Sequence, residues 1–77
     1  MSKKSGTVYY KQNRLKQLRA FCTAAKAGSI SKAAEVLFQS QPTVTLQIQA
    51  LERELDIIVF ERRGPQISLT PEGSVLL

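Results

Sequence analysis

The side chains of this chain that could do chemistry are hydrogen-bond donors and positive charges, rather than general bases or nucleophiles. The 77-residue sequence has no histidine, and its one cysteine, Cys22, falls within an apolar helical pattern. Its six acidic residues form no facing pair, so neither a general base nor a nucleophile is in place. Metal-ligand spacing and a Gly-rich nucleotide loop are also absent from the sequence. We therefore expect a binding protein, with no catalytic residue, no metal site and no cofactor.

Positions 41–46 suit the edges of DNA bases. An amide such as that of Gln41 pairs with adenine through two hydrogen bonds, and the Thr45 hydroxyl can reach a base edge or a phosphate. Pro42 and Leu46 add apolar surface, and a leucine can pack on a thymine methyl group. No acidic residue in this segment would repel a duplex. We predict base contacts from Gln41, Pro42, Thr45 and Leu46; the alternative for Leu46 is a scattered apolar surface residue.

Cations on both sides of this segment suit DNA phosphates. Lys32 precedes it at the start of a predicted helix, whose amide groups also attract anions; the alternative is a solvated lysine. Arg62 and Arg63 follow it at a predicted hairpin, where arginine suits a phosphate or a narrow minor groove, unless both simply pair with Glu61. The predicted backbone contacts are Ser31, Lys32, Thr43 and Arg62, and the predicted wing contact to the minor groove is Arg63.

The charge of the whole chain favours the same partner. Eleven lysine and arginine residues against six acidic residues give a net charge of +5, and the pI is about 9.8. Every charged residue before Glu35 is a cation. Such a field draws polyanions, so nucleic acid is the leading partner, although the charge by itself also fits a role in solubility alone. We expect residues 1–14 to form a flexible basic arm.

Two helices are predicted ahead of the base-contacting segment. Apolar residues recur every three or four positions from Leu15, and the first helix should end at Gly28, because glycine accepts the left-handed conformation of a helix end. Ser29 and Ser31 offer hydroxyls to cap a short second helix. The residues expected to face the core are Leu15, Leu18, Phe21, Cys22, Ala25, Ala33, Ala34 and Leu37.

A third helix should carry the base-contacting residues on its exposed side. Ser40 can cap it, and Pro42 falls in its first turn, where proline breaks no needed hydrogen bond. Spacings of four, three and four predict a buried stripe of Val44, Ile48, Leu51 and Leu55. At about 100° per residue, the opposite face holds Pro42, Leu46, Gln49 and Arg53. Glu52, Arg53 and Glu54 are interpreted as a solvated helix face without a role in DNA binding.

A two-stranded hairpin and the start of a fourth helix follow. Residues 57–60 are β-formers, residues 66–69 alternate polar and apolar, and the tip between them is Arg63-Gly64-Pro65. Thr70 can cap the next helix, with Pro71 in its first position. This order predicts a mainly α fold, a winged helix-turn-helix with a three-helix core and a two-stranded β wing. Residues 15–70 form that domain, and residues 71–77 begin a linker or dimerisation helix that the chain leaves truncated.

Five stretches in this order resemble the N-terminal DNA-binding domain of LysR-type transcriptional regulators. They are LKQLRAF at 15–21, GSISKAAE at 28–35, SQPTVTLQI at 40–48, the segment from LE at 51 to FER at 60–62, and LTPEG at 69–73. The resemblance implies a bacterial regulator whose full-length form is a homodimer or homotetramer joined through the linker helix. It also implies a small-molecule inducer, bound by a C-terminal domain missing here.

Several positions depart from the family's pattern. Leu46 stands where the family often has arginine, which alters the expected base preference, and Asp56 replaces a frequent glycine and must adopt a left-handed or turn conformation. Ile58 replaces a commonly polar residue, so an apolar patch is expected there. Pro65 stands where the family often has arginine, which moves the expected minor-groove contact to Arg63.

The sequence thus predicts sequence-specific binding of double-stranded DNA and regulation of transcription. The alternative is a module that docks another protein through the same exposed helix. A single cysteine allows no intrachain disulfide, and no apolar stretch approaches the roughly 18–20 residues of a membrane span. We expect a cytoplasmic protein that makes no contact with a membrane.

Overall fold

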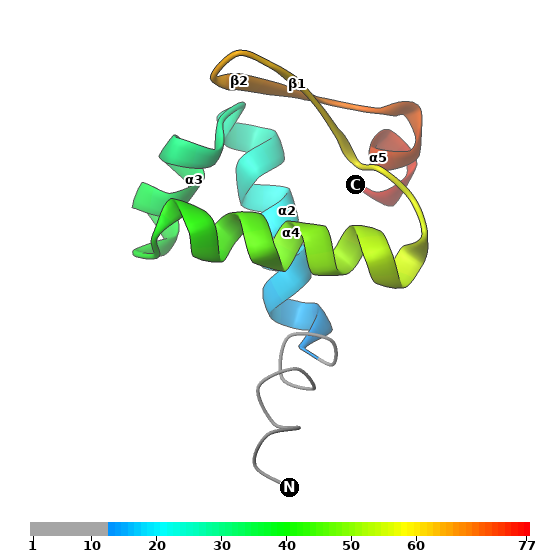
Figure 1. The fold of residues 1–77 in the computed structure, drawn as a ribbon, viewed down its shortest axis with the longest axis horizontal. Coiled ribbons are helices and arrows are strands. Elements are labelled where there is room, and N and C mark those ends of the chain that lie inside the picture. The colour runs from blue at the N-terminus through cyan, green and yellow to red at the C-terminus, as the bar shows by residue number, and fades with distance from the viewer. Residues whose placement is uncertain (1–12) are drawn as a thin grey trace, which may run out of the picture.

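Three helices, a two-stranded ribbon and a short final helix make up the computed structural model, which describes residues 13–77 (Figure 1). In chain order they are α2 (Arg14–Ala27), α3 (Ile30–Leu37), α4 (Gln41–Leu55), β1 (Phe60–Arg63), β2 (Gln66–Leu69) and α5 (Pro71–Leu76). The helices α2, α3 and α4 pack against one another, and the antiparallel ribbon crosses above them. The predicted winged helix-turn-helix is confirmed.

The helices begin and end where their capping residues allow. Gly28 ends α2 with φ 75°, a left-handed conformation, and its N–H donates to the carbonyl of Ala24. Ser29, rather than Ser31, caps α3, because its hydroxyl accepts the Lys32 N–H at 2.9 Å. At the other end of the domain, Thr70 caps α5, and its hydroxyl oxygen accepts the Gly73 N–H at 3.0 Å. A left-handed glycine and two short polar side chains therefore set three of the predicted boundaries.

The first helix starts slightly earlier than the sequence suggested. Asn13 caps α2 through its side-chain oxygen, which accepts the Lys16 N–H at 3.2 Å, and Arg14 is the first helical residue. Neither residue therefore belongs to an arm. The rest of the predicted basic arm, residues 1–12, lies outside the described residues.

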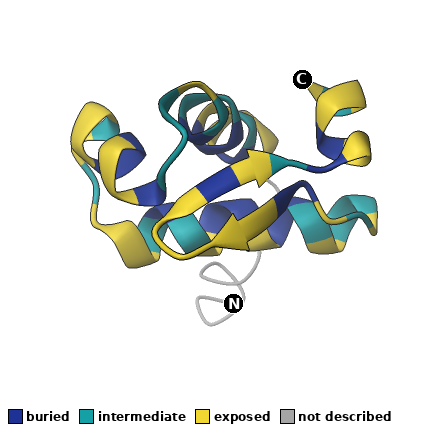
Figure 2. Cartoon of the chain, turned by 90° about the horizontal axis from the view of Figure 1, so that it is seen from above, coloured by how far each residue is buried: buried dark blue, intermediate teal, exposed yellow. Residues whose placement is uncertain are grey.

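The core fills the space between the three helices and the inner face of the ribbon. The rings of Phe21 and Phe60 lie 5.4 Å apart, which joins α2 to β1. Cys22 and Leu37 are half-buried against this core, whereas Leu15 is 68% exposed and does not belong to it. The buried apolar residues that form this core cluster are Ala20, Phe21, Ala24, Ile30, Ala33, Ala34, Val44, Ile48, Leu51, Val59, Phe60 and Ile67. Figure 2 shows these positions in dark blue where the elements face each other.

Glu52 and Glu54 are structural residues, so the interpretation of Glu52, Arg53 and Glu54 as a solvated helix face is wrong for the two glutamates, whereas Arg53 is exposed. Glu52 accepts the N–H of buried Val59 at 2.9 Å. Glu54 accepts from Arg14 at 2.8 Å and from the Gln17 side-chain amide at 3.2 Å, which ties α4 to α2. Both residues are half-buried on α4, and their carboxylates accept hydrogen bonds from groups in other segments.

The first strand is shorter than the run of β-formers suggested, because it begins at Phe60 rather than Ile57. The backbone groups of the preceding residues bond outside the ribbon. The Val59 N–H goes to Glu52, the Val59 carbonyl accepts the Thr70 N–H at 3.0 Å, and the Ile58 carbonyl accepts the Thr70 hydroxyl. The segment 57–59 is therefore a bridge between α4 and α5.

Candidate nucleic-acid interface

The amino-terminal turn of α4 stands clear of the core. Gln41 and Pro42 are exposed, Leu46 is 48% exposed and Thr45 is half-buried. The same four residues line one shallow hollow on the surface. The structure thus brings together all four residues that the sequence predicted to contact bases, on one outward-facing surface.

The Ser40 cap fixes the direction of this turn. Its hydroxyl oxygen accepts the Thr43 N–H at 3.2 Å and its hydroxyl donates to the Thr43 Oγ1 at 2.9 Å. Pro42 restricts the backbone further, since its ring holds φ near the helical value. Thr43 is half-buried and its hydroxyl takes part in the cap. A helix whose first turn is held in this way presents side chains in fixed positions, as base recognition requires.

The exposed surface at this end of α4 carries no charge of its own. From Gln41 to Leu51 the helix has no ionisable side chain, and its charged residues are confined to its last turns. Behind the exposed side, Val44, Gln47 and Ile48 are buried. Amide, hydroxyl and apolar groups are therefore the only chemistry that this turn offers to a ligand.

Lys32 and Ser31 lie on the first turn of α3. Both are exposed, and the capping bond of α3 is made by Ser29 rather than by Ser31. A helix start is favourable for an anion because its amide groups carry partial positive charge. This turn therefore offers a cation, a hydroxyl and a helix start to a phosphate.

The two arginines of the wing leave the ribbon on opposite faces. Arg62 pairs with Ile67, and Arg63 pairs with Gln66. Residues directly opposite in an antiparallel pair share a face, and Ile67 is buried, so Arg62 leaves from the inner face and Arg63 from the outer face. Both side chains are exposed. Arg63 is the last residue of β1 rather than part of the turn, which consists of Gly64 and Pro65.

A backbone hydrogen bond fixes the wing over the start of α3. The N–H of Ile67 donates to the carbonyl of Gly28 at 3.2 Å, and Gly28 lies in the turn between α2 and α3. The hairpin tip, the first turn of α3 and the first turn of α4 all lie toward the left of Figure 1. Lys32 belongs to α3, which packs against α4, and Arg62 belongs to the wing that this bond holds over the turn before α3.

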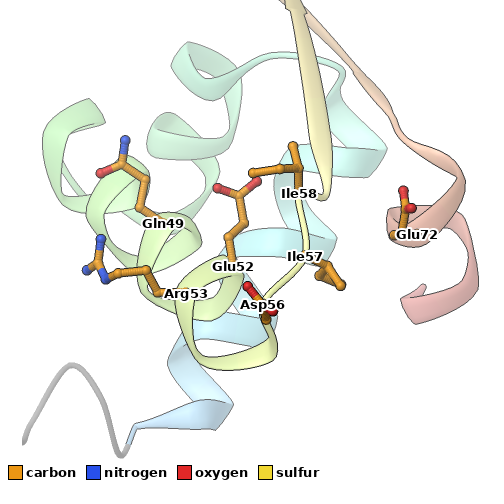
Figure 3. Close-up of a pocket in the computed structure, with 7 residues that line it drawn as sticks. All are labelled: Gln49, Glu52, Arg53, Asp56, Ile57, Ile58 and Glu72. Atoms are coloured by element: carbon orange, nitrogen blue, oxygen red, sulfur yellow. The ribbon is translucent and has the colours of Figure 1, made fainter.

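The other end of α4 has a different character. A second hollow there is lined by Gln49, Glu52, Arg53, Asp56, Ile57, Ile58 and Glu72 (Figure 3). Three of these residues are acidic and one is basic, so this surface is unfavourable for a polyanion. Asp56 adopts the expected left-handed conformation, with φ 57°, and Ile58 is 59% exposed, as its departure from the family's pattern suggested. The two ends of α4 thus differ in charge, and only the amino-terminal end suits DNA.

One feature of the helix-turn-helix had no counterpart in the sequence patterns. Phe38 is 95% exposed and left-handed, with φ 55°, and its N–H closes the end of α3 on the carbonyls of Ala34 and Glu35. A bulky residue rarely takes this conformation, and glycine or asparagine is the usual choice. The turn therefore follows from the packing of α3 and α4 rather than from a local turn residue.

Within residues 13–77, no group of acidic and cysteine side chains could hold a metal ion, and no helix is long and apolar enough to cross a bilayer.

Comparison with known families gives one match over most of the chain. Residues 15–74 match the model of the bacterial regulatory helix-turn-helix proteins of the lysR family. The HTH-type transcriptional regulator CitR of Bacillus subtilis (strain 168) is 53% identical over 62 residues, which are 80% of this chain and 21% of CitR. A probable RuBisCO transcriptional regulator of Porphyra purpurea is 51% identical over 63 residues, 82% of this chain and 20% of that protein. The chain spans about a fifth of the length of these relatives.

Solved structures of two DNA-binding domains resemble this fold closely. The CbnR DNA-binding domain in complex with DNA superposes with a TM-score of 0.77 at 43% identity, over 79% of this chain and 70% of that one. The BenM DNA-binding domain bound to the benA site 1 DNA has a TM-score of 0.76 at 40% identity, over 80% of this chain and 72% of that one. Both of these structures are complexes with DNA.

Proposed function

The chain belongs to the lysR family of bacterial regulatory helix-turn-helix proteins, and from this premise we propose that it binds double-stranded DNA at a specific sequence and thereby regulates transcription. The observation that carries the proposal is the exposed, uncharged first turn of α4, with cations beside it on α3 and on the wing. An α-helix fits the major groove of B-DNA, and flanking cations neutralise the backbone on either side. Its similarity to domains solved with DNA supports the same use of the fold.

Each residue of the interface has a proposed role. Gln41, Pro42, Thr45 and Leu46 contact base edges in the major groove. Ser31, Lys32, Thr43 and Arg62 contact the sugar–phosphate backbone and fix the position of α4 along the duplex. Arg63 reaches the neighbouring minor groove from the outer face of the wing. The Thr43 hydroxyl can serve this role while it accepts from Ser40, because it keeps its own proton to donate.

We extend the proposal to the whole regulator on the strength of its relatives, which are about four times as long as this chain. There, α5 continues into a linker helix that joins two or four copies, and a further domain binds a small-molecule inducer. Two linked modules on adjacent half-sites bind more tightly than one by roughly 10²–10⁴-fold in favourable geometry. Such a regulator works in the cytoplasm, where bacterial DNA lies.

Selection of bound duplexes from a random pool tests the proposal, followed by titration of the recovered duplex at several salt concentrations. We expect a common sequence motif. Each phosphate that a cation neutralises changes the slope of log K against log salt by about −0.9, so Lys32 and Arg62 alone predict a slope of about −1.8. A pool without a common motif, together with binding that is insensitive to salt, would contradict the proposal and favour a module that docks another protein.

A further inference from the structure

Leu46 is an exposed leucine on the turn of α4 that meets the bases in the proposed function, and this inference rests on that function. We propose that Leu46 determines base specificity by contacting the C5-methyl group of a thymine, so that the bound sequence requires thymine at that position. Among the DNA bases without modification, only thymine presents a methyl group in the major groove. The proposed site therefore prefers thymine at one position of the bound sequence, in addition to binding duplex DNA.

The position of Leu46 supports this contact. It follows Pro42 by four residues and lies beside Thr45 on the helix, so the three side chains occupy one arc of α4. With Gln41 they line a single shallow hollow, which Leu46 bounds on the side away from the Ser40 cap. The hollow is uncharged and its surface is mostly apolar. A methyl group that enters it exchanges contact with water for contact with carbon atoms.

The charges of the neighbouring elements favour a duplex as the occupant of the hollow. Exposed Lys32 lies on α3, which packs against α4, and exposed Arg62 lies on the wing that is bonded to the turn before α3, so both are available to DNA phosphates. Ile58 offers a useful contrast, because it is also exposed, at 59%, but shares its hollow with Glu52 and other acidic residues that repel phosphates (Figure 3). An exposed apolar residue next to cations is suited to DNA, whereas one among carboxylates is not.

The expected size of the effect follows from the methyl group. Burial of one methyl or methylene group contributes about 0.8 kcal/mol, which corresponds to a roughly fourfold change in affinity. Removal of the thymine methyl should therefore weaken binding by about fourfold. Removal of the Leu46 side chain should make the protein unable to detect that loss.

The test uses the 77-residue chain and the duplex recovered by selection. Each thymine in turn is replaced by deoxyuridine, which lacks only the methyl group, and the affinity of each duplex is measured by fluorescence anisotropy for the wild type and for Leu46→Ala. The matched control is Ile58→Ala, which truncates another exposed apolar side chain, in the bridge 57–59 that follows α4. Circular dichroism of both variants checks that they are folded.

We expect one deoxyuridine substitution in a half-site to weaken the wild type and Ile58→Ala by about fourfold, and to leave Leu46→Ala unchanged. The inference is overturned if no substitution affects the wild type, or if Leu46→Ala responds as the wild type does. In that case the proposed function still holds, provided that the recovered duplex binds more tightly than a scrambled one. If the two duplexes bind equally well, the proposed function fails and this inference fails with it.

Discussion

Gly73 lies where α5 approaches the bridge 57–59 so closely that no larger residue fits. A Cβ atom added at Gly73 would lie 2.3 Å from the carbonyl oxygen of Val59, and that oxygen accepts the Thr70 N–H at 3.0 Å. Gly73→Ala must therefore displace backbone by about 1 Å to restore an ordinary contact. Overpacking of this kind costs about 1–3 kcal/mol, and a weakened hydrogen bond adds about 1 kcal/mol. The higher helix propensity of alanine returns up to about 1 kcal/mol.

The net expectation for Gly73→Ala is a loss of about 1–3 kcal/mol in the free energy of unfolding. In a domain of this size, each kcal/mol lowers the Tm by roughly 4–8 °C, so thermal unfolding followed by circular dichroism resolves the effect. Ser74→Ala is the matched control, because Ser74 is the next residue of α5 and is exposed. If Gly73→Ala unfolds at or above the wild-type temperature, the contact between α5 and Val59 is not as close as the structure has it.

Two further substitutions separate DNA binding from stability. Lys32→Ala should weaken binding to the recovered duplex and to random duplexes alike, because a phosphate contact carries no sequence information. It should also make the slope of log K against log salt less steep by about 0.9, the contribution of one phosphate contact. The control Lys16→Ala, at the start of α2, should leave this slope unchanged. Glu52→Ala should lower the free energy of unfolding by about 1–3 kcal/mol in urea denaturation, because the buried Val59 N–H loses its acceptor. Glu52→Gln keeps an acceptor and should lose less, and equal losses in the two Glu52 variants would refute this role.

The helices and their ends could be predicted because their causes are local. A serine, asparagine or threonine that accepts the N–H three residues on sets the start of every described helix, and Gly28 sets the end of α2. The capping roles of Ser40 and Thr70 were predicted from each residue and its near neighbours in the chain. The left-handed or turn conformation of Asp56 was expected because it replaces a glycine frequent in the family, and its φ of 57° is left-handed.

The errors of the sequence analysis concern contacts between distant segments. The sequence around Glu52 and Glu54 does not show that Glu52 accepts the Val59 N–H or that Glu54 forms an ion pair with α2. Contacts between distant segments also explain why β1 begins later than predicted, because residues 57–59 bond to α4 and Thr70 instead of to β2. Leu15 has the spacing of a core residue but lies in the first turn of α2, where it is 68% exposed.

The residues of α4 that are proposed to contact bases could be located on its exposed side because burial and exposure follow the helical period. Once Val44, Ile48 and Leu51 define the inner stripe, Pro42 and Leu46 must face outward, as the structure shows. The faces of the wing were harder to assign. Alternation along a strand places Arg62 and Arg63 on opposite faces, but only the pairing of Arg62 with buried Ile67 shows that Arg62 is on the inner face. The burial of Ile67 and its bond to Gly28 belong to the assembled fold.

The most direct test of base recognition by α4 is the ratio of the dissociation constants for a scrambled duplex and for the selected duplex, measured with the wild type and with Gln41→Ala. We predict that Gln41→Ala lowers this ratio by roughly 5- to 150-fold, the equivalent of about 1–3 kcal/mol, while its affinity for the scrambled duplex stays the same. Gln49→Ala, which removes an exposed glutamine next to the acidic hollow of the same helix, should leave the ratio unchanged. A ratio that is the same for Gln41→Ala and the wild type would show that Gln41 does not take part in base recognition.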